Sequence, residues 1–239
     1  MRTLILGLSL PNADFDNYSF LSAPSFAEYH QIVVDVASAA RAVDDVVNGA
    51  GVHQTHGGQA IINGDASAHA FSLRALLGMR RRETEWLLAH GGLVVLFPYP
   101  EVVHQAGGEP WRTYDWLPAP EGLTYAGDLL PGFGVPGAVL VDGEHPFAPW
   151  VQQLAPHVAY RVYLNETAAA AQKAHVFARS GGGQAIGFEL ALGEGRLVVL
   201  PPLVAPQSER PRTAAALVDC LARWNQLAVA PATEEESRD

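Results

Sequence analysis

The sequence predicts an α/β domain with a mostly parallel sheet and an antiparallel hairpin near its C-terminal end. Three short apolar runs, 3–8, 31–36 and 93–97, are rich in β-branched residues, a pattern typical of parallel strands covered on both faces. A helix predicted over 72–90 and a glycine pair separate the last two runs. This order forms a βαβ unit, so we expect these strands at the centre of one sheet.

Between the second and third strands, residues 37–70 are expected to form an insertion. A short helix is predicted over 41–47, followed by a Gly- and His-containing stretch that favours a small hairpin. The helix over 72–90 carries Gly78 near its middle, where we expect a break. The segment 98–136 is rich in Pro, Gly and aromatic residues and has little periodicity, which predicts a long functional loop.

The C-terminal half alternates short strands and helices. Two predicted strands, 174–179 and 184–192, flank a Gly-rich connection at 180–183, which favours an antiparallel hairpin. The remaining expected elements are strands over 138–141 and 196–200 and helices over 147–154 and 213–227. We therefore expect a single domain over 1–229, followed by a disordered acidic tail over 230–239.

Composition narrows the class of protein. The chain has 239 residues, of which 49% are hydrophobic, so it is long enough for one substantial core. No apolar run approaches the roughly 18 residues of a membrane span, and we expect a soluble cytoplasmic protein without a membrane partner. The net charge of −10 disfavours nucleic acid. A single cysteine, Cys220, excludes an internal disulfide or thiolate-cluster metal site, and its apolar neighbours indicate a core position.

The run 177–189, followed by 193–201, resembles the C-terminal part of ThuA-like and related class I glutamine amidotransferase-like domains. In those domains a hairpin leads into a core strand, and a Gly-Arg turn comes just before that strand. Gly195-Arg196 corresponds to this turn here. The segment 80–96 is similar to the helix, glycine pair and strand of the same group. The resemblance covers about half of the chain and implies a flavodoxin-like, mostly parallel sheet.

The resemblance does not extend to the family's catalytic residues. In its catalytic members the strand corresponding to 93–97 leads into a sharp turn that exposes a nucleophilic Cys at a helix N-terminus. Here Phe97 is followed by Pro98-Tyr99-Pro100-Glu101, with neither Cys nor Ser. The family's His and Glu near the last strand are also absent, because Pro201-Pro202-Leu203 follows Leu200. Amidotransferase activity is therefore not expected.

Candidate site residues follow the predicted strands, because ligands of open α/β sheets bind beyond the carboxyl ends of the strands. The candidates are Asp14, Asp16, Asn17 and Tyr18 after the first strand, Asp35 at the end of the second, and Tyr99, Glu101 and His104 after the third. A converging carboxylate and His have the chemistry for acid–base catalysis or for a divalent metal. The alternative is that the aspartates cap local turns and anchor loops.

Three further groups carry polar chemistry. His53 and His56 have a spacing that suits one metal, but no third ligand is evident and the pattern favours a flexible polar loop. Asp142, Glu144 and His145 follow a predicted strand, and turn chemistry also accounts for them. The three consecutive arginines at 80–82 are expected to point to solvent.

The aromatic segment 111–117 contains Trp111, Tyr114 and Trp116. These rings suit stacking on a ligand, anchoring of a protein partner or a homo-oligomer contact, or burial as a lid over the end of the sheet. Two function hypotheses result. The first is a non-catalytic module that binds a small ligand or a protein through this segment and the strand ends. The second is a hydrolase or isomerase that uses Asp35, Glu101 and His104, with or without a metal. The sequence does not indicate whether a cofactor is used or which one.

Overall fold

The computed structural model describes residues 2–46, 51–54, 60–63, 68–106, 109–118, 120–125, 138–154, 160–202 and 207–229. Its main element is a mixed sheet in which ten strands of the described chain take part, with the order β10-β12-β13-β14-β6-β3-β1-β2 along its main path. Five strands run parallel, namely β1 (Thr3–Leu6), β2 (Phe15–Tyr18), β3 (Gln31–Asp35), β6 (Leu93–Phe97) and β14 (Gly195–Val199). The three predicted central strands are therefore confirmed as neighbours.

The other half of the main sheet is antiparallel. Its strands are β9 (Leu123–Tyr125), β10 (Ala138–Leu140), β11 (Val162–Leu164), β12 (His175–Ser180) and β13 (Ala185–Leu192). β12 and β13 form the hairpin predicted from the Gly-rich connection, and β13 pairs with β14. Strands β2, β9 and β11 were not predicted, because each is short and lacks a continuous apolar run.

A second sheet has the order β4-β5-β7-β8. Its strands are β4 (Gly51–Gln54), β5 (Ala60–Asn63), β7 (Val102–Ala106) and β8 (Glu109–Arg112). The predicted hairpin within 37–70 corresponds to β4 and β5. The expectation of one long loop over 98–136 is wrong, because β7 pairs with β5 and with β8, and β9 joins the main sheet.

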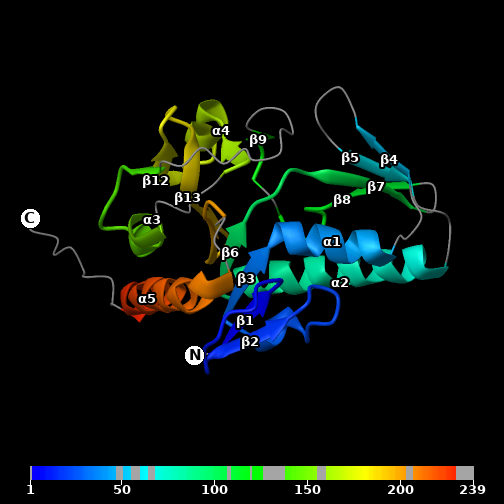
Figure 1. Ribbon diagram of the computed structural model, residues 1–239, viewed down its shortest axis with the longest axis horizontal. Helices are drawn as coiled ribbons and strands as arrows, with labels where there is room; N and C mark the ends of the chain where they lie inside the picture. The colour runs from blue at the N-terminus through cyan, green and yellow to red at the C-terminus, as the bar shows by residue number, and fades with distance from the viewer. Residues whose placement is uncertain are drawn as a thin grey trace, which may run out of the picture.

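Helices cover both faces of the main sheet (Figure 1). They are α1 (Val36–Val46), α2 (Ala68–Ala89), α3 (Ala148–Leu154), α4 (Glu166–Ala171) and α5 (Arg210–Val229), with short 3-10 turns η1 (Phe26–Glu28) and η3 (Gln207–Glu209). α1 lies beside α2, and α3 contacts α5. None of the described helices has the length and apolar character needed to cross a membrane.

Two hydrophobic cores lie on opposite faces of the sheet, because successive strand side chains alternate. Leu4, Ile32 and Val94 pack with residues of α1 and α2, whereas Ile5, Val33 and Val95 pack with residues of α3 and α5. Cys220 belongs to the second core, as predicted, and its burial raises the pKa of the thiol to about 12. Every central strand is therefore buried on both faces.

Helix α2 differs from its prediction in two ways. It runs through Gly78 without a break. Arg80 is not on a solvated face: it is 1% exposed, donates to the carbonyls of Ala23 and Pro24, and pairs with Glu83 at 2.8 Å. Its guanidinium also lies over the Phe26 ring. This arginine fixes the η1 segment to α2, a role that three consecutive arginines in a sequence do not reveal.

Candidate functional site

A pocket of about 270 Å³ lies at the carboxyl ends of the parallel strands. The loop after β1, the end of β3, the end of β6 and the N-terminal turn of α5 contribute to its walls. We refer to it as the strand-end pocket, and its lining residues are Gly7, Leu8, Ser9, Leu10, Asp35, Arg41, Phe97, Trp150, Pro202, Arg210 and Thr213. The pocket is where open parallel sheets are expected to bind ligands.

The loop after β1 takes its shape from Gly7 and Asn17. Gly7 has φ +81°, and a Cβ there would lie 2.3 Å from the Cβ of Ser38, so a side chain is excluded on two grounds. The Asn17 side chain accepts from the Leu10 amide and donates to the Leu10 carbonyl. Asn17 therefore holds the loop that lines the pocket, although it is not itself a lining residue.

Asp35 lies between β3 and α1. One of its oxygens accepts from the Ala37 amide at 3.2 Å, so it caps α1. The structural alternative considered for Asp35 was the anchoring of a loop, not the capping of a helix. Its other oxygen lies 3.9 Å from the Arg41 guanidinium. Burial raises the pKa of Asp35 above its ordinary value, and Arg41 opposes that shift only partly. A carboxyl of this kind accepts or donates a hydrogen bond, depending on pH.

The three proposed catalytic residues lie on different elements of the structure. Asp35 lines the strand-end pocket, whereas Glu101 is not among its lining residues and lies 3.6 Å from the Arg112 guanidinium. His104 is part of β7 in the second sheet. Strand β6 continues into that sheet rather than into a helix, so Glu101 and His104 follow the chain away from the pocket.

Asp14 and Asp16 are also placed differently from the prediction. β2 runs parallel to β1, so the chain returns to the amino end of the sheet before Asp14. The Asp14 carbonyl accepts from the Thr3 amide, and Asp16 pairs with Arg2 at 2.5 Å. Tyr18 ends β2 with an exposed side chain. Neither aspartate lines the strand-end pocket.

Part of the aromatic segment is core. Trp116 is 1% exposed and packs edge-on against Phe20 and Phe26, while the Tyr114 hydroxyl bonds to the backbone of Tyr99. Burial, one of the alternatives considered, therefore accounts for Tyr114 and Trp116. The side chains of His53, His104 and Trp111 lie outside the described residues, as do His56 and the predicted acidic tail.

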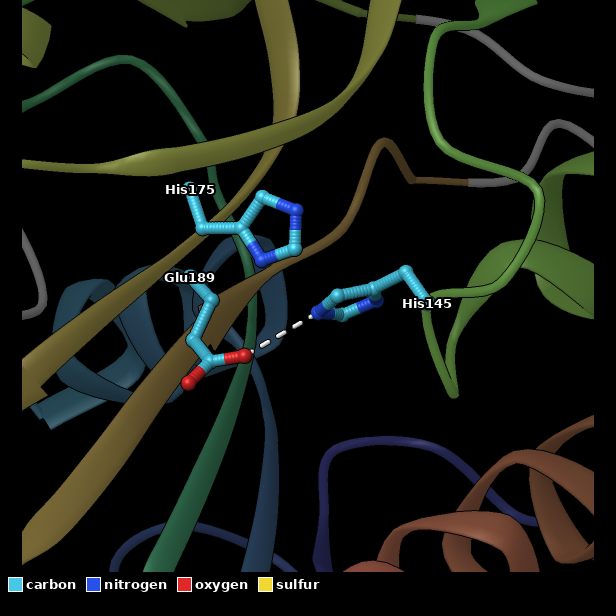
Figure 2. Close-up of side chains that lie close together, drawn as sticks. All are labelled: His145, His175 and Glu189. Atoms are coloured by element: carbon cyan, nitrogen blue, oxygen red, sulfur yellow. Dashed lines mark hydrogen bonds and ion pairs between the residues drawn. The ribbon is translucent and has the colours of Figure 1, made fainter. Parts of the chain in front are cut away.

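A second polar constellation lies at the opposite, amino-terminal end of the parallel strands. Asp142 and His145 precede α3. His175 begins β12 and Glu189 lies on β13, and Figure 2 shows these two side chains with His145. These four residues line a pocket of about 460 Å³, which we call the imidazole pocket, together with Gly91, Glu144, Pro146, Glu194, Arg196, Trp224 and Leu227. The predicted group Asp142, Glu144 and His145 is thus part of a larger cluster.

The two histidines of this cluster each pair with a carboxylate. His145 Nε2 lies 3.0 Å from Glu189 Oε2, and Arg196 Nε lies 3.2 Å from Glu189 Oε1. His175 Nε2 lies 2.9 Å from Asp142 Oδ2. The Glu144 amide, and then the His175 side chain, hold the pKa of Asp142 below its ordinary value. Two imidazole–carboxylate pairs therefore lie next to each other, with the two imidazole ring centroids 5.1 Å apart.

His175 and Glu189 are the functional candidates that the sequence analysis missed. The hairpin register brings them together: the Ser180 amide bonds to the Gln184 carbonyl, and counting outward from this pair places His175 opposite Glu189. The sequence alone does not fix this starting pair. A register irregularity near Ala178 leaves that pairing intact. The contribution of His145 could not be counted in this way, because it arrives from a separate segment of the chain.

Comparison with known proteins adds no identification. No protein-family model matches the chain, and a search of curated proteins finds no match. The candidate sites are therefore interpreted from their own geometry.

Proposed function

We propose that the protein is a binding module that holds a small organic acid in the strand-end pocket. The observation that supports this most directly is the position of the pocket at the carboxyl ends of β1, β3 and β6, with two arginine side chains among its lining residues. Its volume, about 270 Å³, suits a small metabolite better than a nucleotide or a peptide.

The chemistry of the lining residues favours a carboxylate-bearing ligand with a hydroxyl group. The guanidinium groups of Arg41 and Arg210 are suited to bidentate pairing with carboxylates. Asp35 and the Ser9 hydroxyl supply hydrogen-bonding groups for a ligand hydroxyl. Phe97 and Trp150 are buried and offer apolar contact to the carbon skeleton.

A binding role is favoured over catalysis at this pocket, because an enzyme requires acid–base groups around one cavity. Among the described residues, Asp35 is the carboxylate that lines this pocket, and Glu101 does not line it. The continuation of β6 into β7, instead of into a helix, also argues against a nucleophile elbow. We retain as part of the proposal a flavodoxin-like scaffold, a distant relation to the amidotransferase-like superfamily and a cytoplasmic location.

The test is isothermal titration calorimetry of the full chain with succinate, malate and citrate. We expect saturable binding of at least one of these acids to the wild-type protein. Arg210→Ala removes a charge-assisted contact, for which a loss of about tenfold or more in affinity is expected.

Arg223→Ala is the matched control, because Arg223 lies on the same helix, α5, and does not line the pocket. It should bind the acids as the wild type does. The proposal is wrong if none of the three acids binds, or if Arg210→Ala and Arg223→Ala change the affinity equally.

A further inference from the structure

The imidazole pocket contains three side chains with the geometry of a metal site. Within the described residues, His145, His175 and Glu189 each offer one ligand atom, and these atoms all lie within 4.8 Å of one another. A tetrahedral zinc ion with bonds of about 2.0–2.1 Å holds its ligand atoms roughly 3.4 Å apart. Small side-chain rotations therefore bring the three atoms onto one ion.

The orientation of His175 is set by a carboxylate behind it. Because its Nε2 is bonded to Asp142, the ring nitrogen that faces Glu189 and His145 in Figure 2 is Nδ1. Nε2 donates to the Asp142 carboxylate, so Nδ1 carries the lone pair. A carboxylate that orients a histidine in this way is the usual arrangement behind a metal-ligating imidazole.

Glu189 and His145 are held in place by their neighbours. Arg196 binds Oε1 of Glu189, which leaves Oε2 directed at the cluster. The His145 ring stacks on Phe177 with centroids 3.9 Å apart and an interplanar angle of 7°. The side chains of His145, Glu189 and His175 are 2%, 19% and 52% exposed, so the cluster is walled by protein on one side and opens to solvent on the other.

One hydrogen bond, between the Phe147 amide and His145, opposes metal binding and lowers the expected affinity. His145 Nδ1 accepts from the Phe147 amide at 3.2 Å, so its proton is on Nε2, shared with Glu189. A metal at Nε2 requires this proton to move to Nδ1, at the cost of the amide hydrogen bond. We therefore expect micromolar rather than nanomolar affinity.

We propose that His145 Nε2, His175 Nδ1 and Glu189 Oε2 bind one zinc ion, with its fourth position open to the imidazole pocket. Two imidazoles and a carboxylate favour a transition metal over Mg²⁺ or Ca²⁺, which take oxygen ligands. Three protein ligands with one open position are typical of catalytic rather than structural zinc sites. The site is independent of the strand-end pocket, because the two lie at opposite ends of the parallel strands.

The test is calorimetric titration of the full, chelator-treated chain with ZnCl₂, together with the visible spectrum of the Co²⁺-loaded protein. The wild type should bind one equivalent of zinc and give the intense absorption of four-coordinate Co²⁺. His175→Ala removes an exposed ligand and should weaken zinc binding by about 100-fold. Loss of a group that only orients a ligand lowers metal affinity by about 10–100-fold. Asp142→Asn should therefore weaken binding about tenfold and leave the stoichiometry at one.

His30→Ala is the control, because His30 is an exposed histidine that does not line the imidazole pocket. It should bind zinc as the wild type does. Glu189→Gln provides a second ligand variant, and circular dichroism shows whether each variant is folded. The proposal is overturned if the wild type binds no zinc, if folded His175→Ala and Glu189→Gln variants both bind it with wild-type affinity, or if Mg²⁺ binds equally well.

Discussion

Asp35 combines a structural and a ligand-binding position in one residue. It caps α1 through the Ala37 amide and also lines the strand-end pocket. Burial makes ionisation of this carboxyl unfavourable, and Arg41, whose side chain is 72% exposed, provides only a weak counter-charge. A buried carboxyl whose ionisation is unfavourable, in a residue that lines a pocket, is typical of functional positions.

Asp35→Asn should therefore stabilise the protein near neutral pH while weakening ligand binding. Asparagine retains the cap but removes the buried charge. The pKa of Asp35 is higher in the folded than in the unfolded protein. The wild type therefore loses stability as the pH rises between these two pKa values, and above the higher one the loss stays constant. Urea unfolding at several pH values should show the variant's advantage growing across this window.

Asp35→Asn should also bind about tenfold more weakly the organic acid that the wild type binds most tightly. This is the loss expected for one charge-assisted hydrogen bond. Asp219→Asn serves as a control, because Asp219 is exposed on α5 and does not line the pocket. If Asp35→Asn is less stable than the wild type at every pH, the account of the buried charge is wrong.

At the scale of elements, the contact between β14, β6 and α2 depends on glycine. A Cβ on Gly195 would lie 2.6 Å from the Gly92 and Leu88 carbonyl oxygens. These are backbone atoms at the start of β6 and the end of α2, and they have little freedom to move. The close approach places Arg196 beside the imidazole pocket, next to Glu189.

Gly195→Ala should therefore destabilise the protein by about 1–3 kcal/mol, the usual cost of overpacking. Gly181→Ala is the matched control, since a Cβ there meets nothing within 4 Å, and a change within about 0.5 kcal/mol is expected. Chemical denaturation measures both. Equal effects at the two glycines would show that the β14–α2 contact is not tightly packed.

The elements also differ in how far the sequence determines them. Residues 93–97 were predicted with their exact bounds because a continuous apolar run flanked by glycine and proline has few alternatives. The pairing of β7 with β5 was not predicted, because it joins segments about 40 residues apart and nothing local encodes that contact. The β7–β8 hairpin does have a local signal, the glycine pair at 107–108, which the prediction of a long loop overlooked. Gly78 does not break α2, since tertiary packing outweighs the propensity of one glycine.

For the whole molecule, the main sheet separates two candidate sites. The strand-end pocket lies at the carboxyl ends of the parallel strands, and the imidazole pocket lies at their amino ends, beside the antiparallel hairpin. The first was predicted through Asp35, because the rule for parallel sheets needs only the positions of the strand ends. The second was predicted only through Asp142, Glu144 and His145, because its other members come together through the fold.

The most direct test of the central claim, that the strand-end pocket binds small organic acids, is amide chemical-shift mapping of the ¹⁵N-labelled chain. The spectra are recorded with succinate, malate and citrate in turn. The account predicts that at least one acid shifts the amides of Gly7–Leu10 and Asp35–Ser38 and leaves those around His175 and Glu189 unchanged. Shifts confined to the imidazole pocket, or none with any of the three acids, would contradict it.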